Sequence, residues 1–145
     1  MRRLTLLLVA LALPAAAQVR DFSCVGAEQL TEDVAVIPFV ARRDAVTAEA
    51  LAPLGPLAAQ AREAGGRNIC VLGFAGPQEG GAETASRLAA RRARTVALEL
   101  AKLGVERDRV RAEARTRGFL DPAHRERPGG VARSAGVRVV LLPPP

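Results

Sequence analysis

The sequence contains neither tryptophan nor tyrosine, and it has only four phenylalanines and one histidine in 145 residues. Proteins that bind single-stranded nucleic acid stack the bases on aromatic side chains. The arginines here are spread along the chain and interleaved with acidic residues. The formal net charge of +6 therefore indicates no nucleic-acid partner. Lys102 is the only lysine, a bias toward arginine that genomic base composition explains as well as function does.

The residue clusters that support catalysis or metal binding are also missing from the sequence. His124 is the only histidine, and it lies near Arg125 and Arg127 rather than among acidic residues. One such histidine makes neither a metal site nor a catalytic triad, so we interpret it as a surface residue. There is no Cys-x-x-Cys motif, which leaves redox catalysis without support. We predict that the chain is not an enzyme and that it binds no cofactor or metal.

The first residues have the pattern of an export signal. A basic start at Arg2 and Arg3 precedes an apolar run over residues 4–13, and Pro-Ala-Ala-Ala follows at residues 14–17. The run is too short to span a bilayer, so it predicts a signal peptide over residues 1–17, with an uncleaved anchor as the alternative. Removal of this segment lowers the formal net charge from +6 to +4. Because Cys24 follows no small-residue lipobox, we expect no lipid anchor and a mature chain without a transmembrane segment.

Cys24 and Cys70 are the only two cysteines of a chain that we expect in an oxidising compartment. A disulfide between them would fix an N-terminal arm over residues 18–33 to the central strand. The alternative is two separate thiols, with Cys70 serving as a small core residue.

The central part of the chain reads as a strand, a glycine-rich loop and a helix. Residues 69–74 form a nearly continuous apolar run, which is typical of a strand buried on both faces. Glycine and proline over residues 76–81 interrupt both periodicities. The apolar residues that recur at helical spacing after this loop are Ala85, Ala89, Val96, Leu100 and Leu103. Gly104 then predicts the end of the helix.

The remaining elements predict an α+β fold of order β-α-β-α-β-β, a two-layer sandwich of two helices on a mixed sheet of about four strands. Residues 34–40 predict a strand, with Pro38 at an edge or at the strand's end. Pro53 and Pro56 predict that the first helix is bent or begins late. Residues 110–115 alternate as a half-exposed strand does, residues 116–136 form a long loop, and residues 137–142 form the last strand before three prolines.

Two stretches of this unit resemble the OmpA-like peptidoglycan-associated domain. They are residues 73–76, Gly-Phe-Ala-Gly, and residues 88–96, which begin Leu-Ala-Ala-Arg-Arg-Ala and end in valine. The helix half of the family signature is retained. The loop half departs from it, because Ala75 and Gly76 stand where the family has Thr and Asp, and residues 134–136 read Ser-Ala-Gly where it has Asn-Arg-Arg. The resemblance predicts an OmpA-like domain over residues 34–142, followed by a tail at 143–145.

The resemblance also implies a ligand site. In the family, the arginine at the position of Arg92 binds the carboxylate of diaminopimelate in peptidoglycan stem peptides, and a guanidinium suits this role because it binds carboxylates in a bidentate manner. Glu79 is the acid that can replace the aspartate missing at Gly76, and Phe74 completes the predicted site. The alternatives are that Arg92 covers the flank of its helix as a snorkelling side chain and that Glu79 is a solvated loop acid.

We therefore predict an exported periplasmic module of the cell envelope, associated with the outer membrane, that binds peptidoglycan non-covalently. The alternative is a degenerate OmpA-like scaffold that contacts other envelope proteins and binds no glycan.

Overall fold

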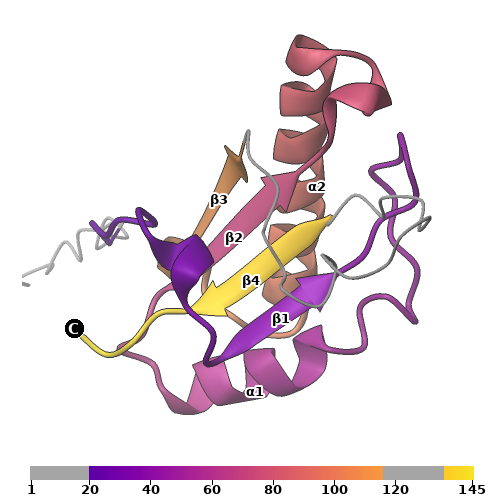
Figure 1. Ribbon diagram of the computed structural model, residues 1–145. Coiled ribbons are helices and arrows are strands. Elements are labelled where there is room, and N and C mark those ends of the chain that lie inside the picture. Colours follow the sequence, from indigo (N-terminus) through magenta and orange to yellow (C-terminus); the bar gives the residue numbers. More distant parts are fainter. Residues whose placement is uncertain (1–19, 116–135) are drawn as a thin grey trace, which may run out of the picture.

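A computed structural model describes residues 20–115 and 136–145 of the chain. It contains a sheet of four strands, β1 (Val34–Ile37), β2 (Ile69–Phe74), β3 (Val110–Arg115) and β4 (Val137–Leu141). Two α-helices, α1 (Leu54–Glu63) and α2 (Ala82–Lys102), connect the first three strands (Figure 1). The predicted α+β fold and its element order are confirmed.

The strand order across the sheet is β1-β4-β2-β3. β2 and β3 are parallel, whereas β4 is antiparallel to both of its neighbours, β1 and β2. The helical connections thus run between parallel strands, as expected for crossovers within one sheet. β1 ends at Ile37 rather than at residue 40, because Pro38 has no N–H to donate to a ladder.

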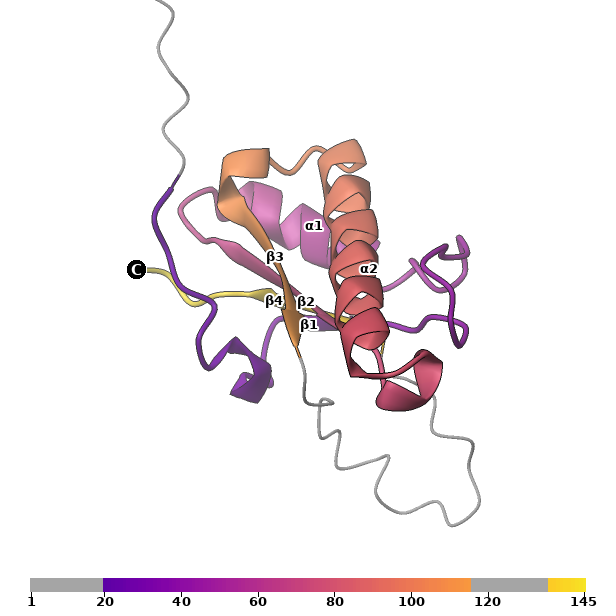
Figure 2. The same cartoon turned by 90° about the horizontal axis from the view of Figure 1, so that it is seen from above.

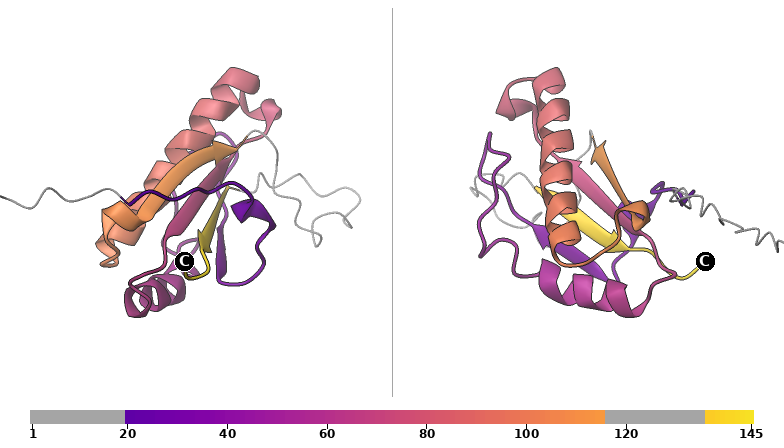
Figure 3. Two further views of the ribbon diagram at one scale, coloured as in Figure 1. Left: turned by 90° about the vertical axis from the view of Figure 1, so that its left-hand side faces the viewer. Right: turned by 180° about the vertical axis from the view of Figure 1, so that it is seen from behind.

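Both helices cover the same face of the sheet (Figure 2). α2 packs on β2 and β3, and α1 packs on β1 and β4. Seen from behind, α2 crosses the sheet in front of the strands (Figure 3). The main core lies between these two layers and includes Ile37, Val71, Val96, Leu100 and Val139, all of which are fully buried.

The segment before β1 covers the opposite face of the sheet (Figure 2). Cys24 and Ala27 pack there against Leu72 and Val140, so β2 is buried on both faces, as its continuous apolar sequence predicts. Cys24 forms a disulfide with Cys70 of β2, with a Cα–Cα distance of 5.7 Å. The predicted disulfide is confirmed, and it joins this segment to the central strand.

Proline and glycine lie at the boundaries of the two helices. Pro53 immediately precedes α1, and Pro56 lies in its first turn, where an N–H would have no intrahelical acceptor. The late start of this helix is confirmed. α2 ends at Lys102, so Leu103 leaves the helical periodicity and is 38% exposed rather than part of the buried stripe.

Candidate functional site

The site forms where β2 ends and α2 begins. After Phe74, a short 3-10 turn (Pro77–Glu79) and two glycines lead into the helix. Gly80 and Gly81 have φ values of 119° and 87°, which residues with a side chain rarely adopt. Pro77 and Gln78 are exposed, but Glu79 is only 4% exposed. The turn therefore directs a single acidic side chain into the protein.

Arg92 meets this acid from the middle of α2, and its side chain is fully buried. Nη2 lies 2.6 Å from Glu79 Oε1, and Nη1 lies 3.2 Å from Glu79 Oε2, in a bidentate ion pair. Nη1 also donates to the Phe74 carbonyl at 2.9 Å, Nη2 to the Val40 carbonyl at 3.1 Å, and Nε to the Arg43 carbonyl at 2.7 Å. All the N–H groups of the guanidinium thus have protein acceptors.

The Glu79 carboxylate is equally saturated with hydrogen bonds. Besides Arg92, the backbone N–H of Arg42 donates to Oε1 at 2.7 Å and that of Gly76 donates to Oε2 at 2.9 Å. Burial acts to raise the pKa of Glu79, but the hydrogen bonds from Arg92, Arg42 and Gly76 outweigh it, so the pKa lies below its ordinary value of 4.5. The carboxylate is therefore ionised at neutral pH.

An aromatic ring and a glycine complete the surroundings of Arg92. The guanidinium carbon lies 5.4 Å from the centre of the Phe39 ring, a cation–π contact. Gly136 packs against the same ring, where an added Cβ would lie 2.4 Å from Phe39 Cδ2 and 2.7 Å from the Ile37 carbonyl oxygen. A side chain at position 136, such as the arginine that the family pattern has there, would have no room in this arrangement.

The structure brings together all four residues predicted for the ligand site, namely Phe74, Gly76, Glu79 and Arg92. It also shows that they bond to one another. Glu79 is not a solvated loop acid, and Arg92 is not a snorkelling side chain, because both are buried. Their role toward a ligand stays a prediction. Positions 124, 134 and 135, for which the sequence also led to expectations, lie outside the described residues.

The loop after β1 is a part of this site that no sequence pattern predicts. Residues 39–43 supply the Phe39 ring, the carbonyls of Val40 and Arg43 and the N–H of Arg42. Three of these contacts come from the backbone, which every residue type carries, so no residue pattern signals them. The one local oddity is Arg42, whose φ of 62° is rare for a residue with a side chain.

A second buried arginine, Arg109, connects the end of α1 to the start of β3. Its Nη2 donates to the carbonyls of Ala61, Ala64 and Arg67 at 2.7–2.9 Å, and its Nη1 pairs with Glu106 at 3.0 Å. These carbonyls belong to the end of α1 and the turn after it, where a positive charge stabilises the helix dipole. Arg109 thus fixes α1 against the strand β3 that it precedes.

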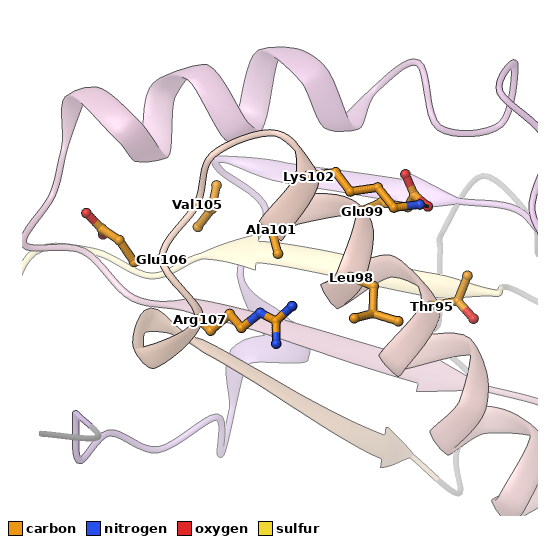
Figure 4. Close-up of a pocket in the computed structure, with 8 residues that line it drawn as sticks. All are labelled: Thr95, Leu98, Glu99, Ala101, Lys102, Val105, Glu106 and Arg107. Carbon is orange, nitrogen blue, oxygen red and sulfur yellow. Dashed lines mark hydrogen bonds and ion pairs between the residues drawn. The ribbon is translucent and has the colours of Figure 1, made fainter. Parts of the chain in front are cut away.

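A pocket of about 530 Å³ lies away from Arg92 and Glu79, at the end of α2 (Figure 4). Its lining residues come from α2 and from the connection to β3, and they are Thr95, Leu98, Glu99, Ala101, Lys102, Val105, Glu106 and Arg107. Lys102 pairs with Glu99 at 2.7 Å, and Glu106 pairs with Arg109. Three of its charged side chains, Glu99, Lys102 and Glu106, are therefore already paired within the chain.

Within residues 20–115 and 136–145, no group of three or more histidine, cysteine or acidic side chains is arranged to hold a metal ion. In the same part of the chain, neither helix is long and apolar enough to cross a membrane.

No protein-family model matches the sequence, and no curated protein matches it. Solved structures do resemble the fold. The peptidoglycan-associated lipoprotein of Burkholderia pseudomallei has a TM-score of 0.59 and 19% identity, over 73% of this chain and 86% of that one. The C-terminal domain of Helicobacter pylori MotB has a TM-score of 0.59 and 18% identity, over 75% and 84%.

A third structure, the OmpA-like domain of FopA1 from Francisella tularensis, has a TM-score of 0.56 and 16% identity, over 80% of both chains. Identities this low show the fold and not the ligand. The described part of this chain has the fold of OmpA-like domains.

Proposed function

We propose that this chain is an exported domain of the bacterial cell envelope that binds peptidoglycan non-covalently, with Arg92 as the residue that binds a stem-peptide carboxylate. The fold supports this proposal, since one of the similar structures is itself a peptidoglycan-associated lipoprotein. The export pattern predicted over residues 1–17 supports a location in the compartment where peptidoglycan lies.

The observation that carries the proposal is the orientation of the Arg92 guanidinium. It faces the end of β2 and presents Nη1 and Nη2 side by side to a carboxylate, at 3.2 and 2.6 Å. This is the bidentate geometry by which arginine recognises carboxylates. In the free chain the carboxylate is that of Glu79, so a stem-peptide carboxylate must compete with it.

Binding should also be weaker than a complete family site allows. The family's aspartate, which meets the ammonium group of the ligand, is replaced by Gly76. Loss of one charge-assisted contact costs about 1.5–3 kcal/mol, roughly a ten- to hundredfold loss of affinity. We expect retention on intact sacculi, where many stem peptides are presented together, to be easier to detect than binding of one soluble peptide.

The test is a pull-down of the mature protein, residues 18–145, with purified sacculi of the diaminopimelate type. A matched sample of sacculi has its free stem-peptide carboxylates converted to amides. The proposal expects retention on the untreated sacculi and loss on the amidated ones. Equal retention on both would show that groups other than the stem-peptide carboxylates hold the protein. N-terminal sequencing of the exported protein, expected to begin at Gln18, tests the export half of the proposal.

The second candidate function is an interaction scaffold of the envelope that binds no glycan. It is favoured by the saturation of Arg92 and by the packing of Gly136 against Phe39, which together leave the site filled by the chain itself. Absence of retention on either kind of sacculus supports this candidate over the first.

A further inference from the structure

We propose that Glu79 is an internal ligand: its carboxylate fills a carboxylate-binding site built by Arg92, Arg42 and Gly76, and an external carboxylate enters only in its place. The inference rests on the proposed function for the identity of the competing ligand, a peptidoglycan carboxylate. Its test, however, requires only a simple carboxylate.

The site matches the full hydrogen-bonding capacity of a carboxylate. Two oxygens accept about four hydrogen bonds, and here four N–H donors meet them at 2.6–3.2 Å, two from Arg92 and one each from the backbones of Arg42 and Gly76. The donors converge from α2, from the loop after β1 and from the loop after β2. An isolated ion pair would need only the arginine.

The donors are held in position without Glu79. Hydrogen bonds to the carbonyls of Val40, Arg43 and Phe74 fix all three nitrogens of the Arg92 guanidinium. The Phe39 ring lies against the same group. When the Glu79 carboxylate leaves, the framework therefore retains an oriented guanidinium. A preorganised site of this kind binds a new carboxylate without first having to order itself.

The loop after β1 adopts a strained backbone conformation at the residue that completes the site. Arg42 has a φ of 62°, in the left-handed region that side chains disfavour, and in this conformation its N–H donates to Glu79 at 2.7 Å. Backbone strain of this kind persists where the surrounding structure requires it, often at ligand sites. Here the contact that accompanies the strain is with the carboxylate.

The donors belong to well-packed segments, whereas Glu79, whose carboxylate they bind, is part of a short turn. Glu79 is the buried residue of the turn Pro77–Glu79, and Pro77 and Gln78 are exposed. Outward movement of this turn uncovers the guanidinium while α2 and the sheet keep their packing. While Glu79 occupies the site, its ion pair with Arg92 is neutral overall, so the site does not attract weakly binding anions. A ligand must supply a carboxylate together with contacts that Glu79 does not make.

The experiment is chemical rescue of Glu79→Ala by acetate. This variant removes the internal carboxylate and leaves space beside Arg92. We expect its melting temperature to rise with the logarithm of the acetate concentration, relative to sodium chloride at equal ionic strength, because acetate binds only the folded state. Acetamide, which has the same shape without the charge, should give no such rise.

Wild type and Glu83→Ala are the controls. Glu83 is an exposed acid in the first turn of α2 that pairs with Arg87. Both controls should respond to acetate no more than to chloride, because Glu79 still occupies the site. The inference is overturned if Glu79→Ala responds to acetate no more than these controls do. It is also overturned if acetamide stabilises the variant equally.

If Glu79→Ala does not fold in sodium chloride, the experiment measures instead whether acetate restores folding. Acetate, and not acetamide, should then restore the circular dichroism of the folded protein, and Glu79→Ser should behave in the same way. Failure of acetate to restore either variant overturns the inference. Binding to sacculi is measured in a separate experiment. If acetate rescues the variant but the protein is not retained on sacculi, the proposed function is refuted, whereas the role of Glu79 as an internal ligand is supported.

Discussion

Gly73 of β2 lies directly beneath Ala89 of α2, so closely that a Cβ atom at position 73 would stand 2.0 Å from the Ala89 carbonyl oxygen. No side chain separates the helix backbone from the strand at this point. Arg92 follows Ala89 by less than one helical turn, and its Nη1 reaches the carbonyl of Phe74, the residue after Gly73. The depth of this helix–strand contact therefore brings the guanidinium to the end of β2.

Gly73→Ala should destabilise the protein by about 1–3 kcal/mol or more, because the added methyl group forces α2 away from the sheet. The measurement is the free energy of unfolding in urea. Gly55→Ala is the matched control, since Gly55 lies within α1 and a Cβ there meets nothing within 4 Å. This control should stabilise the protein by about 0.5–1 kcal/mol. Similar effects of both substitutions would contradict the close contact.

Arg92→Ala should lower the free energy of unfolding by on the order of 3–5 kcal/mol, because it leaves the Glu79 carboxylate buried without its partner. Arg91→Ala removes a neighbouring arginine whose ion pair with Asp44 is half exposed, at 49% for both side chains. Its effect should stay below about 1 kcal/mol. Urea unfolding of the two variants measures the difference. A cost for Arg91→Ala equal to that for Arg92→Ala would contradict the buried position of Arg92.

The ion pair also predicts how stability depends on pH. The folded-state pKa of Glu79 lies below its ordinary value of 4.5, so the group stabilises the fold above the unfolded pKa, and this stabilisation is lost as the pH falls through the folded value. Glu79→Gln removes this titration. The difference in unfolding free energy between wild type and Glu79→Gln should therefore be largest near neutral pH and shrink steadily below about pH 4.5.

Asp33 must be separated from this effect. Its pKa is also lowered, first by the hydrogen bond from Arg67 and then by that from Gln60. Asp33 is unchanged in Glu79→Gln, so its contribution cancels in the difference between the two proteins. A difference that stays constant between pH 7 and pH 3 would show that Glu79 does not titrate with a lowered pKa.

Loss of the disulfide should cost about 4 kcal/mol in the chain-entropy model, given the 46-residue separation of Cys24 and Cys70. The double variant Cys24→Ser/Cys70→Ser should also release the segment that covers Leu72 and Val140. Binding of a hydrophobic dye, compared with wild type before and after reduction, reports that exposure. Peptide mapping of the exported protein without reductant should recover the two cysteines linked, and recovery of both as free thiols would exclude the bridge in the cell.

The fold could be predicted because its signals are local. The continuous apolar run of β2, the alternation in β3 and the helical spacing of Ala85, Ala89, Val96 and Leu100 each follow from a single stretch of chain. Proline and glycine add the boundaries, as in the early end of β1 and the late start of α1. A short-range pattern is enough to predict an element when the pattern itself shows which faces of that element are buried.

The sequence, through its resemblance to the OmpA-like family, also selected Arg92, Glu79, Gly76 and Phe74, and these residues do lie together. Their role toward a ligand stays a prediction. Only the tertiary structure decided how they are used. Whether an arginine beside an apolar stripe is exposed or buried depends on what the loop after β1 places above it. Here that loop supplies carbonyls, an N–H and the Phe39 ring. Backbone groups are the same for every residue type, so the saturation of Arg92 and its pairing with Glu79 became visible only when distant segments were brought into contact.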